Sequence, residues 1–448
     1  MTATESSTAT DFGGADPVDL LNACPAFRAR NFPDAMGALR SKDVIAPAYL
    51  FAGAHLDKSG LAERSVAGYL DGAFLFLDGD AHRGRRKLLN QLVRPAALDD
   101  FRDAVIAPQC DVVLDRQVTG SHVDGLHRVE LVRMSDRVFL HFSAKLVGLV
   151  GIDTDERLEQ LRECILPLQG AMVGIFAQDR LAATQAADAA KKRYVEEFYR
   201  PSLEYWKKTV TEIEHGDRAA DEVPTSFLRF VAEGQHPDYA DERIAIIESM
   251  LLFVTSVGTS TQGLVNTVNE LTQWFERHPE QYHLRTDYNF LLRSLQETLR
   301  LYGPPTAYLM RQAARDFTIE GTEIKAGQEL RICVPAANRD TDVWGADANE
   351  FNPHRVVPEG RNRYGVAFGV GIHQCYGLRV VLGSDGTGGS HVRVLQKLFE
   401  LGIDRDPRNP AHMFPQTIAP EDGTDTVRWV DYPVVLKNWD PNRTHSSQ

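Results

Sequence analysis

Long hydrophobic runs, paired cysteines and an excess of basic residues are all missing from this sequence of 448 residues. No run approaches the roughly 18 consecutive apolar residues that a membrane-spanning helix needs, so we expect no membrane partner. Lys and Arg number 49 against 62 Asp and Glu, and the net charge of −13 argues against a nucleic-acid partner. The five cysteines are widely separated and never form a Cys-x-x-Cys pair, which disfavours a disulfide framework or a structural zinc site. These absences predict a soluble, cytoplasmic protein.

The organisation of the chain is that of one large domain. Apolar residues make up 43% of the sequence, and no internal repeat or long low-complexity linker divides it. We therefore predict a single domain over residues 17–448 after a disordered N-terminal tail, residues 1–16. From about residue 95 to about residue 300, apolar residues recur at helical spacing, for example over Arg128 to Leu149 and Ala182 to Val210. The longest predicted helix runs from Asp241 to His278, where Pro279 ends it, and must pass through the core.

The residue pattern in the last third of the chain predicts a few strands and one interrupted helix. After Pro304-Pro305, the stretch FTIEGTEIKAGQELRICV alternates apolar and polar residues around glycines, as a small hairpin sheet does. The fold class is therefore mainly α with a small β region. The glycine-rich segment Gly383–Gly389 lacks the Lys-Ser/Thr of a phosphate loop and does not match GxGxxG. We interpret it as a flexible break in a helix.

One stretch near the C-terminus carries most of the chemical information. It reads Phe368-Gly369-Val370-Gly371-Ile372-His373-Gln374-Cys375-Tyr376-Gly377 and resembles the FxxGxHxCxG signature of the cytochrome P450 superfamily. The resemblance implies that Cys375 is the thiolate ligand of haem b iron. A thiolate ligand donates electron density that favours O–O cleavage at the opposite position. Its sulfur must therefore be held rigidly and protected from protonation by backbone N–H donors. The alternative for a lone cysteine is a buried structural thiol in a glycine-rich turn.

The other members of the signature have supporting roles in this interpretation. Gly369, Gly371 and Gly377 belong to the tight turn that brings the backbone to the cofactor and starts the next helix. Phe368 would pack near the sulfur, and His373 would reach a haem propionate.

Four further segments precede the cysteine loop in the chain, in the order expected for this family. Glu297 and Arg300 form a Glu-x-x-Arg pair on one helical face, and Arg355 would complete a buried Glu-Arg-Arg clamp with a structural role. His82 and Arg86 match the family's HxxxR element, and Arg311 matches the arginine of its small sheet. The resemblance implies that these three residues bind the propionates. The alternative for the basic run around His82 is a solvated helix face.

The long helix departs from the family pattern, which places an acid and an alcohol beside the oxygen-binding site. One register puts Gln262 and Gly263 at these positions, and a register one turn earlier puts Gly258 and Thr259 there. Neither register has a carboxylate, and glutamine has no proton to exchange near neutral pH. We predict that Thr259 and Gln262 line the distal pocket. The alternative for the hydroxyls of this helix is hydrogen bonding to its own carbonyls.

The resemblance implies a helical prism enclosing haem b, with the substrate above the haem. It implies a monooxygenase or oxidase that acts on a small, natural-product-like substrate with electrons from a separate ferredoxin or flavodoxin and its reductase. The missing acid keeps open an isomerase, a dehydratase or a peroxide-using enzyme, and a non-catalytic haem protein is a minor alternative. Three segments are expected to line the pocket besides the long helix: Tyr69 to Phe76, Leu166 to Ala177 and Thr306 to Met310.

Overall fold

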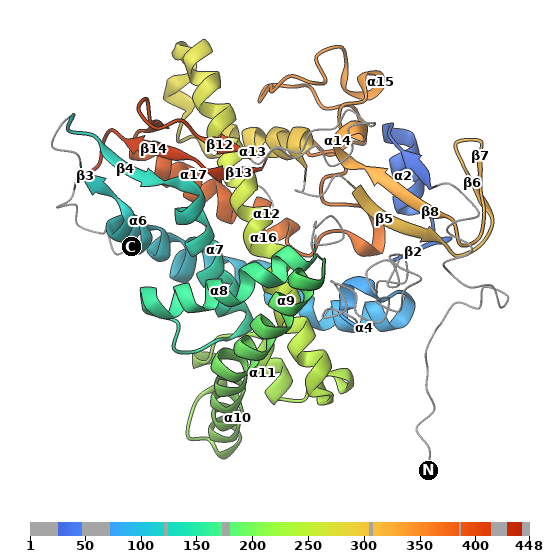
Figure 1. The fold of residues 1–448 in the computed structure, drawn as a ribbon, viewed down its shortest axis with the longest axis vertical. Coiled ribbons are helices and arrows are strands. Elements are labelled where there is room, and N and C mark those ends of the chain that lie inside the picture. The colour runs from blue at the N-terminus through green and yellow to red at the C-terminus, as the bar shows by residue number, and fades with distance from the viewer. Residues whose placement is uncertain are drawn as a thin grey trace.

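The computed structural model describes residues 26–46, 72–120, 124–172, 180–303, 308–384, 387–413 and 428–440. The tail, residues 1–16, lies outside these ranges, as do parts of the three pocket segments. Helices form most of the described part, and two four-stranded sheets lie on opposite sides of it (Figure 1). The prediction of a mainly α fold with a small β region is confirmed.

The α-helices are α2 (Phe32–Arg40), α4 (Gly79–Leu89), α5 (Pro95–Phe101), α6 (Ala107–Gln117), α7 (Leu131–Val147), α8 (Asp155–Met172), α9 (Arg180–Tyr194), α10 (Arg200–His215), α11 (Phe227–Ala232), α12 (Glu242–Arg277), α13 (Tyr288–Tyr302), α14 (Val334–Ala337), α15 (Thr341–Trp344), α16 (Leu378–Leu382) and α17 (Ser390–Glu400). The main sheets are β1 (Phe27–Ala29), β8 (Glu329–Cys333), β5 (Tyr308–Ala313) and β2 (Val44–Ile45), and β11 (Ile403–Arg405), β14 (Pro433–Leu436), β4 (His127–Glu130) and β3 (Thr119–Gly120). Three two-stranded pairs complete the set: β6 (Phe317–Ile319) with β7 (Thr322–Ile324), β9 (Gly383–Ser384) with β10 (Thr387–Gly388), and β12 (His412–Met413) with β13 (Trp429–Asp431).

Helix α12 is the long central helix that the sequence predicts. It begins after Asp241, whose carboxylate accepts a hydrogen bond from the Arg243 N–H, and it ends at Arg277 before His278 and Pro279. By length and composition alone it is apolar enough to cross a membrane, but 72% of its most apolar window is buried inside the protein. We therefore identify α12 as a core helix.

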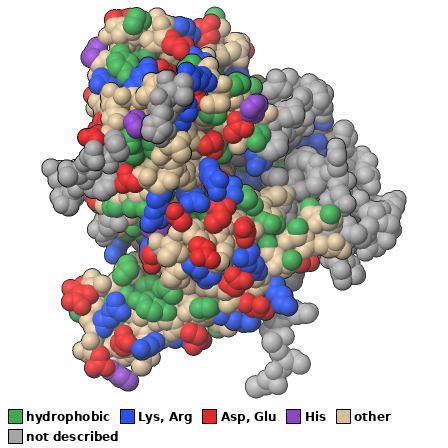
Figure 2. All heavy atoms as spheres, turned by 60° about the vertical axis from the view of Figure 1, so that its left-hand side comes forward, with side chains coloured by type: hydrophobic (Ala, Val, Ile, Leu, Met, Phe, Trp, Pro, Cys, Tyr) green, Lys and Arg blue, Asp and Glu red, His purple; other side chains and the backbone are tan. Residues whose placement is uncertain are grey.

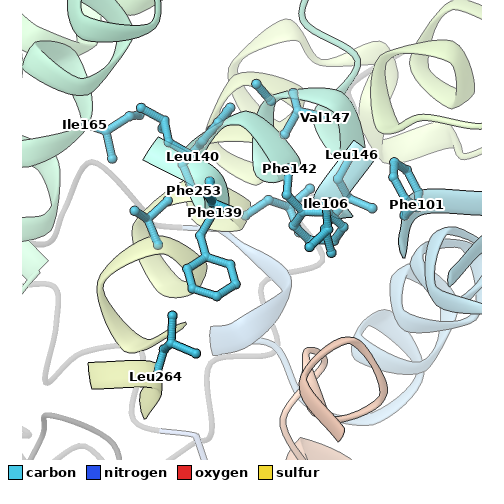
Figure 3. Close-up of a cluster of buried hydrophobic side chains, with 14 of the residues drawn as sticks. Phe101, Ile106, Phe139, Leu140, Phe142, Leu146, Val147, Ile165, Phe253 and Leu264 are labelled. Carbon is cyan, nitrogen blue, oxygen red and sulfur yellow. The ribbon is translucent and has the colours of Figure 1, made fainter. Parts of the chain in front are cut away.

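The core around α12 is built by aromatic and aliphatic side chains of three helices. Figure 3 shows Phe253 and Leu264 of α12 lying near Phe139 of α7, with Ile165 of α8 close by. All four side chains are at most 2% exposed. Burying each stabilises the fold by roughly 1.5–3 kcal/mol, so this packing fixes the position of α12.

Long-range pairing shortens one predicted helix. Residues 127–130, at the start of the predicted helix Arg128 to Leu149, form strand β4 because they pair antiparallel with β14. Helix α7 therefore starts at Leu131, and it ends before Gly148, which adopts a φ of 93°. A Cβ at Gly148 would lie 2.5 Å from the Ser226 hydroxyl oxygen, so only glycine fits there.

The glycine-rich segment does interrupt a helix. Helix α16 ends at Leu382, β9 and β10 form a small antiparallel pair, and α17 begins at Ser390. A Cβ at Gly389 would lie 2.8 Å from the Val381 carbonyl oxygen. The chain therefore leaves the end of α16 and returns to it, with glycine required at the point of contact.

Candidate functional site

The loop before Cys375 is shaped by glycines. Gly369 and Gly371 have φ values of 63° and 77°, in the left-handed region that favours glycine. A Cβ at Gly371 would lie 3.1 Å from the Leu39 carbonyl oxygen, so the loop also packs closely on α2. The Cys375 N–H donates to the Phe368 carbonyl oxygen over 2.7 Å, which closes the loop. The cysteine is thereby held in one backbone position.

The Cys375 sulfur has the donors that a thiolate requires. The N–H groups of Gly377 and Leu378 donate to it, and Arg86 lies near enough to stabilise negative charge. Burial raises the pKa of the Cys375 thiol, and the two N–H donors and Arg86 act in the opposite direction. The side chain is nevertheless accessible to a solvent probe. The sulfur is therefore held by backbone donors while one side of the residue stays open to a ligand.

Basic side chains from two elements gather beside this loop. Arg86 of α4 donates from Nη2 to the Gln374 carbonyl oxygen over 2.9 Å, and its guanidinium lies 5.4 Å from the centre of the Tyr376 ring. The rings of His82 and His373 have centroids 4.6 Å apart. The structure therefore brings His82, Arg86 and His373 together as the sequence predicts.

Asp78 is the member of this group that sequence reasoning missed. Its carboxylate lies 2.8 Å from Nε2 of His373 and accepts a hydrogen bond from the Ala46 N–H. Arg311 also interacts electrostatically with Asp78, and burial lowers the pKa of Arg311. The sequence signal that could have identified Asp78 is its position immediately before α4, the helix that carries His82 and Arg86.

His82 has unused hydrogen-bonding capacity. Its side chain is 2% exposed, and neither ring nitrogen has a hydrogen-bond partner in the described part of the chain. Burial lowers the pKa of His82 to about 4, and the neighbouring His373 and Arg86 act in the same direction. A buried polar group without a partner costs about 1–3 kcal/mol, so the protein alone does not explain this side chain. An anionic group that accepts a hydrogen bond would satisfy it.

The Glu-Arg-Arg clamp forms as predicted. Glu297 accepts hydrogen bonds from Arg300, over 2.9 and 2.8 Å, and from Nε of Arg355, over 2.8 Å. Glu297 and Arg300 have fully buried side chains, and that of Arg355 is 3% exposed. Both arginines also donate to backbone carbonyls of residues 338–350. The clamp therefore ties α13 to the segment that leads into the cysteine loop.

The middle of α12 is open to solvent on one side. Thr259 is exposed although Val257 and Thr261 on either side of it are buried. The Thr259 hydroxyl donates to the Thr255 carbonyl oxygen over 2.7 Å, and the Thr255 hydroxyl donates to the Leu251 carbonyl oxygen over 2.7 Å. The hydroxyls therefore bond to their own helix, as the alternative interpretation held, while their oxygens keep acceptor capacity.

Gln262 does not share this open side with Thr259. Its amide pairs with the backbone of Trp429 in β13, donating over 3.0 Å and accepting over 2.7 Å, and it is 7% exposed. A Cβ at Gly263 would face Leu299 and His391 in the core. The expectation that Gln262 lines the pocket therefore needs correction, because β13 occupies both of its polar groups. The structure favours the register in which Gly258 and Thr259 stand at the family's acid and alcohol positions.

Comparisons with known proteins agree with this geometry. The sequence-family model described as "Cytochrome P450" matches residues 266–381. The "Biotin biosynthesis cytochrome P450" of Bacillus subtilis is 25% identical over 309 residues, covering 68% of this chain and 67% of that protein. The "Indoleacetaldoxime dehydratase" of Arabidopsis thaliana is 35% identical over 99 residues, 21% of this chain and 20% of that protein. The crystal structure of "HmtT Involved in Himastatin Biosynthesis" has a TM-score of 0.66 at 23% identity, covering 92% of this chain and 91% of that one.

The chain belongs to the cytochrome P450 superfamily. The matches to curated P450 relatives span from 17% to 67% of those proteins. P450 proteins bind haem b through a cysteine thiolate. The residues of this P450 fit that group, because Cys375 is exposed and, in the described part of the chain, His82 lacks a partner for either ring nitrogen. Cys375 would hold the iron, and His82, Arg86, Arg311 and His373 would hold the propionates.

Proposed function

We propose that this P450 is a haem-thiolate oxidoreductase that acts as a monooxygenase or oxidase on a small organic substrate. The observation that carries the proposal is the Cys375 loop, with its two N–H donors to sulfur and the unpartnered His82 beside it. A haem held by the Cys375 thiolate would supply oxygen activation, because the sulfur would donate electron density to the iron. The protein's part is to hold the sulfur, bind the propionates and keep an open face on α12 at Thr259.

A natural-product-like substrate is proposed from the neighbours and from the open face. HmtT is described as involved in himastatin biosynthesis, and it shares the fold over 92% of this chain. Thr259 offers a polar contact within the polar stretch 255–262 of α12, and apolar residues predominate in the helix before this stretch. A mostly apolar pocket with a few polar anchors suits a small organic molecule.

A second candidate reaction needs neither oxygen nor external electrons. Gly258 and Gln262, at the two candidate acid positions, carry no carboxylate, and this favours an isomerase, a dehydratase or a peroxide-using enzyme. The name of the Arabidopsis relative, a dehydratase, supports this candidate. A non-catalytic haem protein would turn over no substrate under any condition.

Labelled oxygen separates these functions. Compounds that bind are first selected by the change in haem absorption, and turnover is then followed with ¹⁸O₂ and an electron donor. We expect product only when oxygen and electrons are both present, with label in the product for a monooxygenase. Product in anaerobic solution without reductant or peroxide would overturn this proposal in favour of the second candidate. Turnover with peroxide alone would assign the peroxide-using reaction.

Electron supply gives a second prediction. Arg379 of α16 and Arg83 of α4 are exposed near the cysteine loop, whereas Arg363 is partly buried and donates to the Arg355 carbonyl oxygen. Over the described part of the face drawn in Figure 2, acidic and basic side chains are intermixed. We propose that a separate ferredoxin or flavodoxin, both acidic, docks beside Arg379 with salt-dependent rates.

The Arg379→Glu variant is expected to be reduced about tenfold more slowly at low ionic strength and to lose most of the salt dependence. Stopped-flow reduction by an acidic ferredoxin measures both effects. Lys208→Glu, on the exposed face of α10, is the matched charge reversal and should leave the rate unchanged. Equal rates for the two variants would exclude docking at Arg379.

A further inference from the structure

Gly258 leaves a gap in α12 that a side chain from another helix fills. A Cβ at Gly258 would lie 3.6 Å from Nε2 and 4.0 Å from Oε1 of Gln169, which belongs to α8. The amide therefore packs directly against the backbone of α12, one residue before the exposed Thr259. An aspartate or glutamate at position 258 would have to displace Gln169.

The amide of Gln169 has an unused donor. Its Nε2 is inaccessible to solvent and has no hydrogen-bond partner in the part of the chain that the structure describes. A buried N–H group without an acceptor costs free energy, and native proteins satisfy the great majority of such groups. Gln169 as a whole is only partly buried, so a rotation of its side chain would let the amide reach an oxygen atom bound beside Gly258.

The neighbouring hydroxyls supply the complementary acceptors. The Thr259 and Thr255 hydroxyl hydrogens are used in bonds to carbonyls of α12, so their oxygens can only accept further hydrogen bonds. A water molecule or a hydroxyl can accept from the Gln169 amide and donate to such an oxygen. α8 thus supplies an unused donor beside Gly258, and α12 supplies acceptor oxygens one residue after Gly258 and three residues before it.

We propose that Gln169 is a positioning residue that binds one oxygen atom beside Gly258, either of a water molecule or of the substrate. This inference rests on the proposed function and gives α12 a polar partner where the family has an acid. The amide holds the oxygen in place but releases no proton, since its N–H does not ionise near neutral pH. A proton would have to come from the bound water or from the substrate itself.

The test compares Gln169→Met, which keeps the length and removes the amide, with Gln160→Met on the same helix. Gln160 accepts a hydrogen bond from Arg157 and is partly exposed, so its replacement controls for a new methionine on α8. High-resolution crystal structures of the substrate-free, haem-containing protein show whether an oxygen lies at a hydrogen-bond distance, about 2.7–3.2 Å, from Nε2. Binding is measured with the tightest compound from the absorption screen and with its analogue that lacks oxygen atoms.

If the bound oxygen belongs to water, electron density for it is present beside Nε2 in the unchanged protein and absent in the Gln169→Met variant. If it belongs to the substrate, Gln169→Met weakens binding of the oxygen-bearing compound about 5–10-fold and leaves the analogue within about twofold. Absence of the density together with unchanged binding would overturn the inference. Neither readout needs turnover, so failure of the proposed oxidoreductase activity would be seen separately.

Discussion

The Cys375→Ala variant is expected to lose the absorption of the ferrous carbon monoxide complex that is diagnostic of thiolate ligation, and with it all turnover. The Cys375 sulfur receives N–H donors from Gly377 and Leu378, and the residue is exposed. Alanine cannot bind iron, so no thiolate would remain at position 375 to donate electron density to it. The spectrum of the reduced, carbon-monoxide-treated protein is the measurement.

Cys164→Ala is the matched control. Cys164 is buried in α8, and burial raises its pKa to about 11, so it is a structural thiol. Its variant should keep the thiolate spectrum with an intensity in proportion to the haem content. A thiolate spectrum that survives in Cys375→Ala would assign the ligand elsewhere.

The Glu297→Gln variant is expected to lose about 3–5 kcal/mol of folding free energy, because buried Arg300 would keep its charge without a carboxylate and Arg355 would retain only Asp347 as a carboxylate partner. Glutamine preserves the volume and part of the hydrogen bonding, so the loss reports the charge. The backbone carbonyls that accept from Arg300 and Arg355 do not neutralise it. Urea unfolding followed by circular dichroism measures the change, and loss of haem during purification would accompany it.

Glu204→Gln provides the comparison at the same sequence spacing. Glu204 pairs with Lys207 on α10, three residues apart, and both side chains are exposed by more than half. Such a surface pair contributes about 0–1 kcal/mol to the free energy of unfolding, so its loss should barely change the urea concentration at the midpoint of unfolding. Similar losses for the two variants would show that the Glu297 cluster is not a structural clamp.

Local patterns in the sequence predicted those features that depend on neighbouring residues. The bounds of α12 follow from Asp241 at one end and Pro279 at the other. The hairpin of β6 and β7 follows from alternation around Gly321, which adopts a φ of 85°. The cysteine loop follows from glycines whose conformations no other residue adopts easily. Each of these signals is complete within a few residues.

Pairing between distant segments decided the rest. Residues 127–130 form a strand rather than the start of a helix because they pair with β14, which follows about three hundred residues later in the chain. Gln262 turns to β13 because the Trp429 backbone offers one donor and one acceptor there. Helical spacing cannot reveal either partner.

The sequence by itself therefore determined the family signature, the ligand cysteine as a prediction, the basic residues beside it and the Glu-Arg-Arg cluster. Only the tertiary structure decided which residue of α12 is open, since Thr259 and Gln262 both belong to the polar stretch 255–262 and lie three residues apart on one helix. It also revealed Gln169 and Asp78, because their partners lie on other elements and a gap at a glycine becomes visible only when a second helix fills it. Periodicity specifies which face of a helix is apolar, but the identity of what covers that face depends on contacts far apart in the chain.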